Sequence, residues 1–128
     1  MALRPVFEQA AAAHGVPANY LEAIAWVESG WNEAAVSPAK AVGIGQILPT
    51  TAQEVNQAQK TNLAITAVND NINLEASYVS YLNRTLGGNP CLVTAAYNEG
   101  PKNLLSVGVY YETQNYVYEV LGHRANFS

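Results

Sequence analysis

The chain has 128 residues, of which 49% are hydrophobic and 12% are charged, and its formal net charge is −4. This length supports one domain with a substantial core and is too short for two ordinary domains, so we expect a single domain over residues 1–128. The acidic balance and the six scattered basic residues exclude the basic surface that binds nucleic acid.

Helical patterns follow one another along the chain, with Pro or Asn near their starts and Gly just past their ends. Alternating β-branched runs are scarce, so we expect a mainly α fold. The Pro- and Gly-rich stretch between the second and third helices predicts an irregular loop or a small β-hairpin. Residues 58–68 are ambiguous. The predicted helices cover about residues 3–14, 17–29, 49–57, 70–86, 91–98 and 113–121.

The second predicted helix carries the first candidate site residue. Glu28 shares one helical face with apolar residues at positions i, i+3 and i+4, which are Leu21, Ile24 and Ala25. Burial on this face and the negative end of the helix dipole both disfavour a charged carboxyl, so we expect the raised pKa that suits a general acid. A glutamate that reaches solvent at a frayed end, or pairs with Lys or Arg, fits the same pattern. Glu22 lies off this face, and we expect it on the surface.

Further candidate residues lie where predicted elements end. Gln46 follows Gly45, and a glycine there lets a ligand approach both amide and backbone, although a plain turn residue fits equally well. Tyr97 and Asn98 close a short predicted helix, where a tyrosine can also complete a core. Eight tyrosines and two tryptophans among few charges suit stacking on sugar rings, and equally suit a helical core with polar edges.

Several classes of site and location are disfavoured. Cys91 is the single cysteine, so no internal disulfide forms, and His14 and His123 are far apart without a Cys or carboxylate cluster, so we expect no metal. No apolar run reaches the roughly 20 residues that span a bilayer. The first residues, "MALRP", do not resemble a signal peptide. The chain therefore stays inside the cell, has lost a signal peptide, or is one domain of a larger protein.

Taken in order, these segments resemble the soluble lytic transglycosylase family, a lysozyme-like family of peptidoglycan-cleaving enzymes. "ESGWN" carries Glu28 as in the family's catalytic motif, and "SPAKAVGIGQILPTTA" follows the family's loop from a serine, Ser37, to a glutamine, Gln46. "NINLEASYVSYL" resembles the family's Asn-Ile helix, "AAYNEGP" closely matches a hallmark motif, and "ETQNYV" supplies Tyr116. The resemblance extends over about residues 5–121.

The resemblance implies a lysozyme-like domain and a role for each matching residue. Glu28 would be the single catalytic acid and base. Tyr97 would hydrogen-bond near this glutamate and help to hold it, Asn98 would support the loop or contact substrate, and Tyr116 would line the groove close to Glu28. Sugar binding beside the cleaved bond would fall to Ser37 and Gln46.

The implied reaction cleaves the β-1,4 bond between N-acetylmuramic acid and N-acetylglucosamine without a cofactor. Glu28 protonates the bridging oxygen, the substrate's acetamido group assists, and Glu28 then takes the proton of the muramic C6 hydroxyl, which closes on C1. A hydrolase of the same fold and a catalytically silent peptidoglycan-binding module are the alternatives. The implied partner is the peptidoglycan glycan strand. The implied location is the periplasm, the cell envelope or a virion, and the chain would form part of a larger protein, a secretion machine or a virion.

Three positions depart from the family pattern. Lys40 stands where the family usually has Gly, and Gly45 replaces a common Met, which reduces the apolar wall beside Gln46. Glu75 stands where the Asn-Ile helix usually has Gly, on or beside an apolar face that should pack inward. We expect Glu75 to be structural or ion-paired, with Lys40 or Arg84 as its partner. Substrate contact at the groove rim and a water-activating base are the alternatives.

Overall fold

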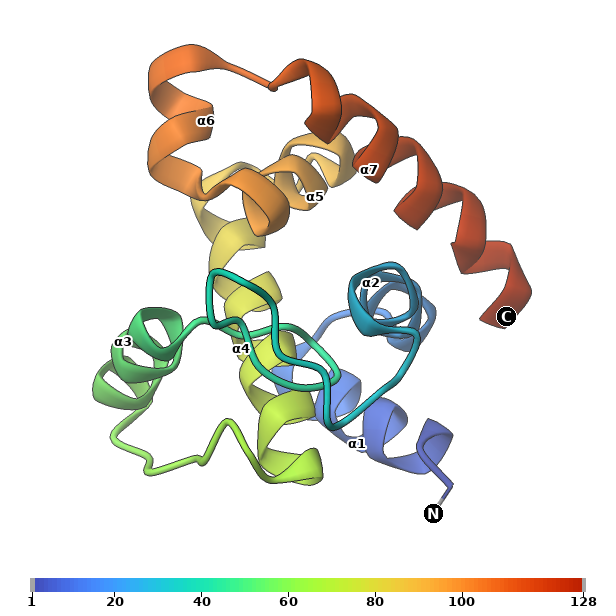
Figure 1. The fold of residues 1–128 in the computed structure, drawn as a ribbon, viewed down its shortest axis with the longest axis vertical. Helices are drawn as coiled ribbons and strands as arrows, with labels where there is room; N and C mark the ends of the chain where they lie inside the picture. Colours follow the sequence, from blue (N-terminus) through green and yellow to red (C-terminus); the bar gives the residue numbers. More distant parts are fainter. Residues whose placement is uncertain (1, 128) are drawn as a thin grey trace.

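The computed structural model describes residues 2–127, and helices dominate this part of the chain (Figure 1). The predicted mainly α fold is therefore confirmed. Between the second and third helices, isolated bridges pair Val36 with Val42 and Val42 with Ile47, so this segment is an irregular loop. The helices are α1 Arg4–His14, α2 Ala18–Ser29, α3 Pro49–Gln59, α4 Val68–Thr85, α5 Pro90–Glu99, α6 Pro101–Val107 and α7 Tyr111–His123, followed by the 3-10 helix η1 Arg124–Phe127.

Most helix ends follow the punctuation in the sequence. Gly15 and Gly30 adopt left-handed φ angles of 67° and 64° directly after α1 and α2, a conformation that glycine adopts at little cost. Asn89 caps α5, because its side chain accepts hydrogen bonds from the backbone N–H groups of Cys91 and Leu92. The local chemistry of the chain thus sets where these helices start and stop.

Helix α6 and η1 are absent from the sequence-based prediction. The Gly100–Pro101 pair ends α5 and also begins α6, because Gly100, at φ 89°, turns the chain and Pro101 suits the first turn of a helix. Helix α6 has seven residues and buries Leu104, while Leu105 and Val107 remain exposed. A segment this short gives no clear helical periodicity.

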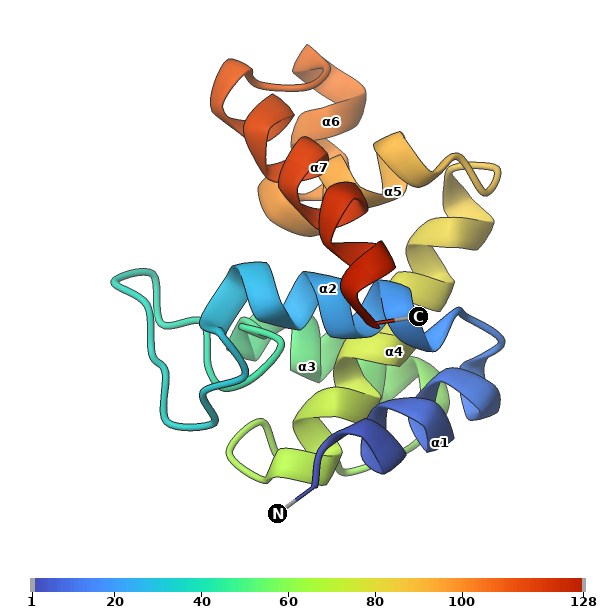
Figure 2. The same ribbon diagram turned by 90° about the vertical axis from the view of Figure 1, so that its right-hand side faces the viewer.

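Helix α4 runs through the middle of the molecule, with α1, α3 and α5 packed against it (Figure 1). Helix α2 packs between α1 and α7, and Figure 2 shows α7 crossing over α2. This arrangement brings the C-terminal end of α2, the loop before α3, and helices α5 and α7 together. The core they enclose contains the fully buried Phe7, Leu21, Ile24, Ile44, Ile47, Ile72, Leu74, Val79, Leu82 and Val93.

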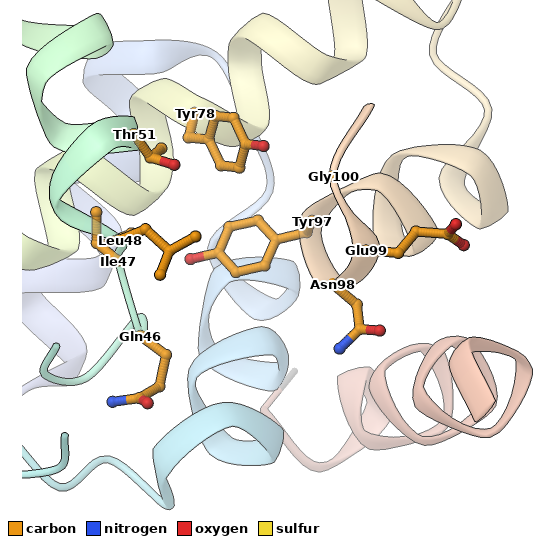
Figure 3. Close-up of a pocket in the computed structure, with 9 residues that line it drawn as sticks. All are labelled: Gln46, Ile47, Leu48, Thr51, Tyr78, Tyr97, Asn98, Glu99 and Gly100. Atoms are coloured by element: carbon orange, nitrogen blue, oxygen red, sulfur yellow. The ribbon is translucent and has the colours of Figure 1, made fainter. Parts of the chain in front are cut away.

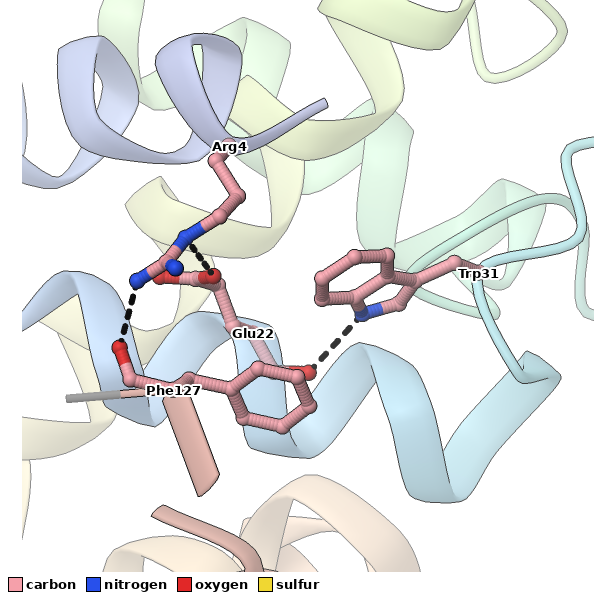
Figure 4. Close-up of polar contacts among 4 residues, drawn as sticks. All are labelled: Arg4, Glu22, Trp31 and Phe127. Carbon is pink, nitrogen blue, oxygen red and sulfur yellow. Dashed lines mark hydrogen bonds and ion pairs between the residues drawn. The ribbon is translucent and has the colours of Figure 1, made fainter. Parts of the chain in front are cut away.

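Glu22 lies in the interior, so its predicted surface position is wrong. Its side chain is 1% exposed and forms an ion pair with Arg4, whose Nε lies 3.2 Å from the carboxylate (Figure 4). Arg4 also donates a hydrogen bond to the backbone carbonyl of Phe127 at 2.7 Å. The indole N–H of Trp31 donates to the backbone carbonyl of Glu22 at 3.0 Å. Helix α1 and η1 thus cover the side of α2 that carries Glu22, which lies off the apolar stripe of this helix.

Within residues 2–127, no helix combines the length and the apolar character that crossing a bilayer requires.

Candidate active site

Glu28 occupies the last turn of α2, next to the loop that carries Gln46. Gly30 ends the helix in a left-handed conformation, and its N–H still donates to the carbonyl of Trp26. The Ser29 hydroxyl donates to the backbone carbonyl of Ile44 at 2.7 Å. The run Glu-Ser-Gly therefore places the carboxyl, ties the helix end to the loop and stops the helix. Sequence reasoning did not assign this tethering role to Ser29.

The environment of Glu28 favours the protonated form. Burial raises the pKa of Glu28 to about 7, and a hydrogen bond from Tyr116, which favours the carboxylate, opposes this effect in part. The Tyr116 hydroxyl donates to Oε2 at 2.8 Å. No ion pair of Glu28 occurs within the described part of the chain. The pKa shifts in the direction expected from the sequence, and both protonation states are accessible near neutral pH.

The loop before Gln46 rests on Asn71, a buried residue of α4. The N–H of Gly45 donates to Asn71 Oδ1 at 2.8 Å, and Asn71 Nδ2 donates to two further backbone carbonyls. A Cβ at Gly43 would lie only 2.6 Å from Asn71 Nδ2, so a side chain there would collide with the amide. Sequence reasoning missed Asn71 as an individual residue, although its place at the start of the Asn-Ile segment was the available signal.

Gln46 is held by its own side chain in a strained turn. Its φ of 50° is left-handed, and its Nε2 donates to the backbone carbonyls of Ala35 at 3.1 Å and Gly43 at 2.9 Å. Lys40 has the same handedness, with φ 69°, a conformation that glycine adopts at less cost than lysine. The hydroxyl of Ser37 accepts the N–H of Ala41 at 3.0 Å, so Ser37 closes a turn within this loop.

A hollow of about 130 Å³ lies between the Gln46 loop, α3, α4 and α5 (Figure 3). Tyr97 extends from α5 toward the Gln46–Leu48 segment, and its hydroxyl donates to the backbone carbonyl of Gly45 at 2.7 Å. Asn98 Oδ1 accepts a hydrogen bond from Thr113, which links α5 to α7. The lining residues are Gln46, Ile47, Leu48, Thr51, Tyr78, Tyr97, Asn98, Glu99 and Gly100.

The structure brings most of the sequence-predicted site residues to one region. Gln46, Tyr97 and Asn98 line the hollow, and Glu28 lies close enough to raise the pKa of Tyr97, after burial and Glu75. The hydrogen bond to the glutamate comes from Tyr116, whereas Tyr97 donates to a backbone carbonyl. Ser37 does not line this hollow.

A second hollow of about 330 Å³ adjoins the first, and Thr51 and Tyr78 form part of the wall of both. The rings of Tyr78 and Tyr81 stack here, with centroids 6.4 Å apart and planes at 11°. Tyr81 is about half exposed. Exposed aromatic faces of this kind suit the apolar faces of sugar rings.

Glu75 packs inward, as its helical face predicted. It pairs with neither Lys40 nor Arg84 and does not lie at a groove rim, so the expected ion pair and the alternative of a rim contact are wrong. Its side chain is 0% exposed, and neither carboxyl oxygen has a hydrogen-bond partner among residues 2–127. Burial raises the pKa of Glu75 well above its ordinary value, and the charges of Glu28 and Glu22 add to this. A Cβ at Gly45 would lie 3.1 Å from Glu75 Cβ, so Gly45 and Glu75 pack directly against each other.

No group of three His, Cys, Asp or Glu side chains among the described residues could hold a metal ion. The site therefore consists of a carboxyl that titrates near pH 7, a phenol bonded to it, and a hollow lined by amides and tyrosines. These features define a mainly helical fold with a candidate acid–base site at the end of α2.

Comparison with known proteins identifies the family. The model of the family described as "Transglycosylase SLT domain" matches residues 5–118, and the chain belongs to this family. Over 106 residues it is 32% identical to the soluble lytic murein transglycosylase of Escherichia coli and 31% identical to that of Salmonella typhimurium. These matches cover 79% of this chain and 16% of each relative, so the chain spans about a sixth of their length.

Solved structures agree with this assignment. The 70 kDa soluble lytic transglycosylase of Escherichia coli superposes with a TM-score of 0.90 at 28% identity, over 98% of this chain and 24% of that one. The lytic transglycosylase Slt of Pseudomonas aeruginosa, solved as an inactive glutamate-to-glutamine mutant, gives 0.89 at 28% identity, over 99% and 24%. The lysozyme-like fold predicted from the sequence is thereby confirmed.

Proposed function

We propose that this chain is a peptidoglycan lytic transglycosylase domain in which Glu28 is the single acid and base. The observation that carries the proposal is the state of Glu28: burial raises its pKa to about 7, and Tyr116 holds its carboxyl at 2.8 Å. A group with a pKa near the working pH can both give and take a proton. The substrate bond is the β-1,4 link between N-acetylmuramic acid and N-acetylglucosamine.

In the reaction Glu28 gives up one proton and later takes up another. Protonated Glu28 donates to the bridging oxygen, the C1–O bond breaks, and the substrate's acetamido oxygen bonds to C1. The Glu28 carboxylate then takes the proton of the muramic C6 hydroxyl. O6 displaces the acetamido oxygen at C1, which gives a 1,6-anhydro sugar and restores protonated Glu28. Neither water nor a cofactor enters the balance.

The site residues have matching proposed roles. Gln46 and Asn98 would hydrogen-bond the sugar in the hollow. Tyr97 would hold the Gln46 loop in place through its hydrogen bond to the Gly45 carbonyl. Ser37 would contact the sugar from the outer part of the loop. The Slt proteins to which this chain is similar include one solved as an inactive glutamate-to-glutamine mutant, which supports a glutamate-dependent reaction.

The alternatives are less consistent with the geometry. An inverting hydrolase uses a second carboxylate to activate water, and Glu75, the candidate for that role, is 0% exposed. A silent binding module would not need a carboxyl whose pKa is shifted to about 7. With peptidoglycan strands as its partner, the proposed enzyme would act in the periplasm, in the cell envelope or from a virion. It would do so as part of a larger protein or a secretion machine.

Replacing Glu28 by Gln tests the proposal. The amide is nearly isosteric but cannot act as an acid, so activity on purified cell walls should fall below a tenth of wild type while the melting temperature is retained. Glu33→Gln, a change at an exposed carboxyl in the following loop, is the matched control and should remain active. Turbidity of a wall suspension measures both variants. Activity above a tenth in Glu28→Gln would refute the assignment.

A further inference from the structure

Two polar contacts join the end of α5 to the first turn of α7. Oε1 of Glu99 accepts the backbone N–H of Tyr110, the residue directly before α7, at 3.1 Å. The hydroxyl of Thr113 donates to Oδ1 of Asn98 at 3.1 Å. Asn98 and Glu99 are the last two residues of α5, and Tyr110 provides no side-chain cap of its own. The end of α5 therefore supplies the polar contacts with which α7 begins.

These contacts lie in the interior. Thr113 is 1% exposed and Glu99 is 9% exposed. The second carboxyl oxygen of Glu99, Oε2, is buried and has no hydrogen-bond partner among the described residues. Because an incompletely bonded carboxyl is costly to bury, Glu99 is a poor source of stability. Its hydrogen bond instead determines where α7 begins relative to α5.

Thr113 and Tyr116 are three residues apart, so they are neighbours on one face of α7. Val117 and Val120 continue this face at positions i+4 and i+7 and pack against the core. Apolar packing is not directional, whereas a hydrogen bond requires a particular distance and angle. The contacts at the first turn therefore fix the rotation of α7 one turn before Tyr116.

The Tyr116 hydroxyl lies 2.8 Å from Oε2 of Glu28, and a hydrogen bond of this kind weakens steeply when it is misaligned. We propose that Glu99 and Thr113 are positioning residues, which hold the first turn of α7 on the end of α5 and thereby keep the Tyr116 hydroxyl on the catalytic carboxyl. This role rests on the proposed function of Glu28 as acid and base. The contact with Asn98 uses its amide oxygen, so the amide nitrogen can still serve the sugar.

Titratable groups of three other helices face Glu28 in the described part of the chain: Tyr116 of α7, Tyr97 of α5 and Glu75 of α4. Tyr97 donates to the Gly45 carbonyl, and the Glu75 carboxyl has no hydrogen-bond partner among residues 2–127. Tyr116 is thus the group through which the contact between α5 and α7 reaches Glu28. Its hydrogen bond lowers the pKa of Glu28 against the larger effect of burial, so loosening the start of α7 should raise that pKa.

Matched substitutions at the two positions separate the hydrogen bonds from the general effects of mutation. Thr113→Val and Glu99→Leu remove the donor and the acceptor, whereas Thr113→Ser and Glu99→Gln keep them. The first pair should move the alkaline limb of kcat/KM to higher pH by at least about 0.3 unit, toward the limb of Tyr116→Phe. The second pair should keep the wild-type limb. So should Glu112→Gln, which replaces an exposed carboxyl in the same turn of α7.

The same shift is measured without activity. A carbon NMR titration of the Glu28 carboxyl, assigned by its absence in Glu28→Gln, should give a higher midpoint in Thr113→Val and in Glu99→Leu. Neither change should raise the midpoint further in the Tyr116→Phe background, because both act through the phenol. Asn98→Ala removes the acceptor of Thr113 at an exposed position, so it should raise the midpoint as well and replaces Thr113→Val if that variant does not fold.

Each residue is judged by its own pair of variants. A wild-type midpoint in folded Thr113→Val or Glu99→Leu, even with a lowered melting temperature, would leave that residue a structural role only and overturn its assignment. An equal shift in the conservative variants, or a further rise in the Tyr116→Phe background, would overturn the proposal as a whole. Absence of wall cleavage by wild type would refute the proposed function, and the titration would still decide whether the end of α5 positions Tyr116.

Discussion

Tyr116 and Glu28 are 88 residues apart in the chain, and the phenol of one donates a 2.8 Å hydrogen bond to the carboxyl of the other. This bond connects α7 to the last turn of α2. Burial first and the charge of Glu28 second raise the pKa of Tyr116 well above its ordinary value, so the phenol stays a donor throughout the neutral range. Two opposing effects therefore set the pKa of Glu28: burial favours the acid, and Tyr116 favours the carboxylate.

Tyr116→Phe should move the pH dependence of activity. In wild type, kcat/KM should fall above about pH 7, where Glu28 loses the proton that it donates. Removing the phenol leaves burial unopposed, so this alkaline limb should shift to higher pH, by up to about one unit, while maximal activity falls several-fold. Profiles of kcat/KM between about pH 5 and about pH 9 measure the shift. Tyr118→Phe, at an exposed tyrosine of the same helix, should leave the profile unchanged. A limb that moves to lower pH would contradict this account.

Arg4→Met should destabilise the fold by about 1 kcal/mol, because Glu22 would lose its cation. The arginine side chain is 54% exposed, so screening keeps the effect well below that of a fully buried pair. Burial already raises the pKa of Glu22, and removal of Arg4 should raise it further. The folded state then binds more protons than the unfolded state. The loss of stability in Arg4→Met should therefore grow as pH rises through the pKa of Glu22 in the folded state.

Urea unfolding near pH 5 and near pH 8 measures this prediction. Glu22→Gln in the Arg4→Met background should recover most of the loss, because the amide carries no charge. Arg84→Met, which removes a hydrogen bond to Ser80 on the surface of α4, should cost less than about 0.5 kcal/mol. An equal loss in both arginine variants would show that the Glu22 pair has no special effect.

Tyr97→Phe should cost both stability and activity. The sequence suggested that Tyr97 serves the site rather than the core, but in the structure it lines the hollow and is also buried, at 8% exposure. Loss of its hydroxyl leaves the Gly45 carbonyl unpaired, which should cost about 1–2 kcal/mol. Gln46→Ala, at a half-buried position, should cost about 0.5 kcal/mol and lower activity through KM. Thermal unfolding and initial rates separate the two effects, and unchanged activity in Gln46→Ala would assign Gln46 a purely structural role.

The sequence predicted what local chemistry determines. Gly30 ends α2 one residue after Ser29, and the apolar stripe turns Glu28 inward, so both the helix and its candidate acid could be placed from spacing alone. Glu22 could not, since its burial depends on α1 and η1, which arrive from the two distant ends of the described chain. Gly45 and Glu75 were interpreted as separate departures because their contact joins positions 30 residues apart, which no helical or strand period connects.

The products of digestion decide between transglycosylase and hydrolase. We expect wild type to release mainly 1,6-anhydro-muropeptides, each lighter by one water than the corresponding hydrolysis product. Inverting hydrolysis requires a second carboxylate that holds a water molecule, at roughly 6.5–9.5 Å from the acid. Glu75 cannot hold an incoming water in this way, because its side chain is 0% exposed and its pKa is raised well above the ordinary value, mainly by burial. Glu75→Gln should therefore leave the product type unchanged, as mass spectrometry of the soluble fragments will show. A wild-type digest dominated by reducing-end muramic acid, lost when Glu75 is replaced by Gln, would instead make the protein a lysozyme in mechanism as well as in fold.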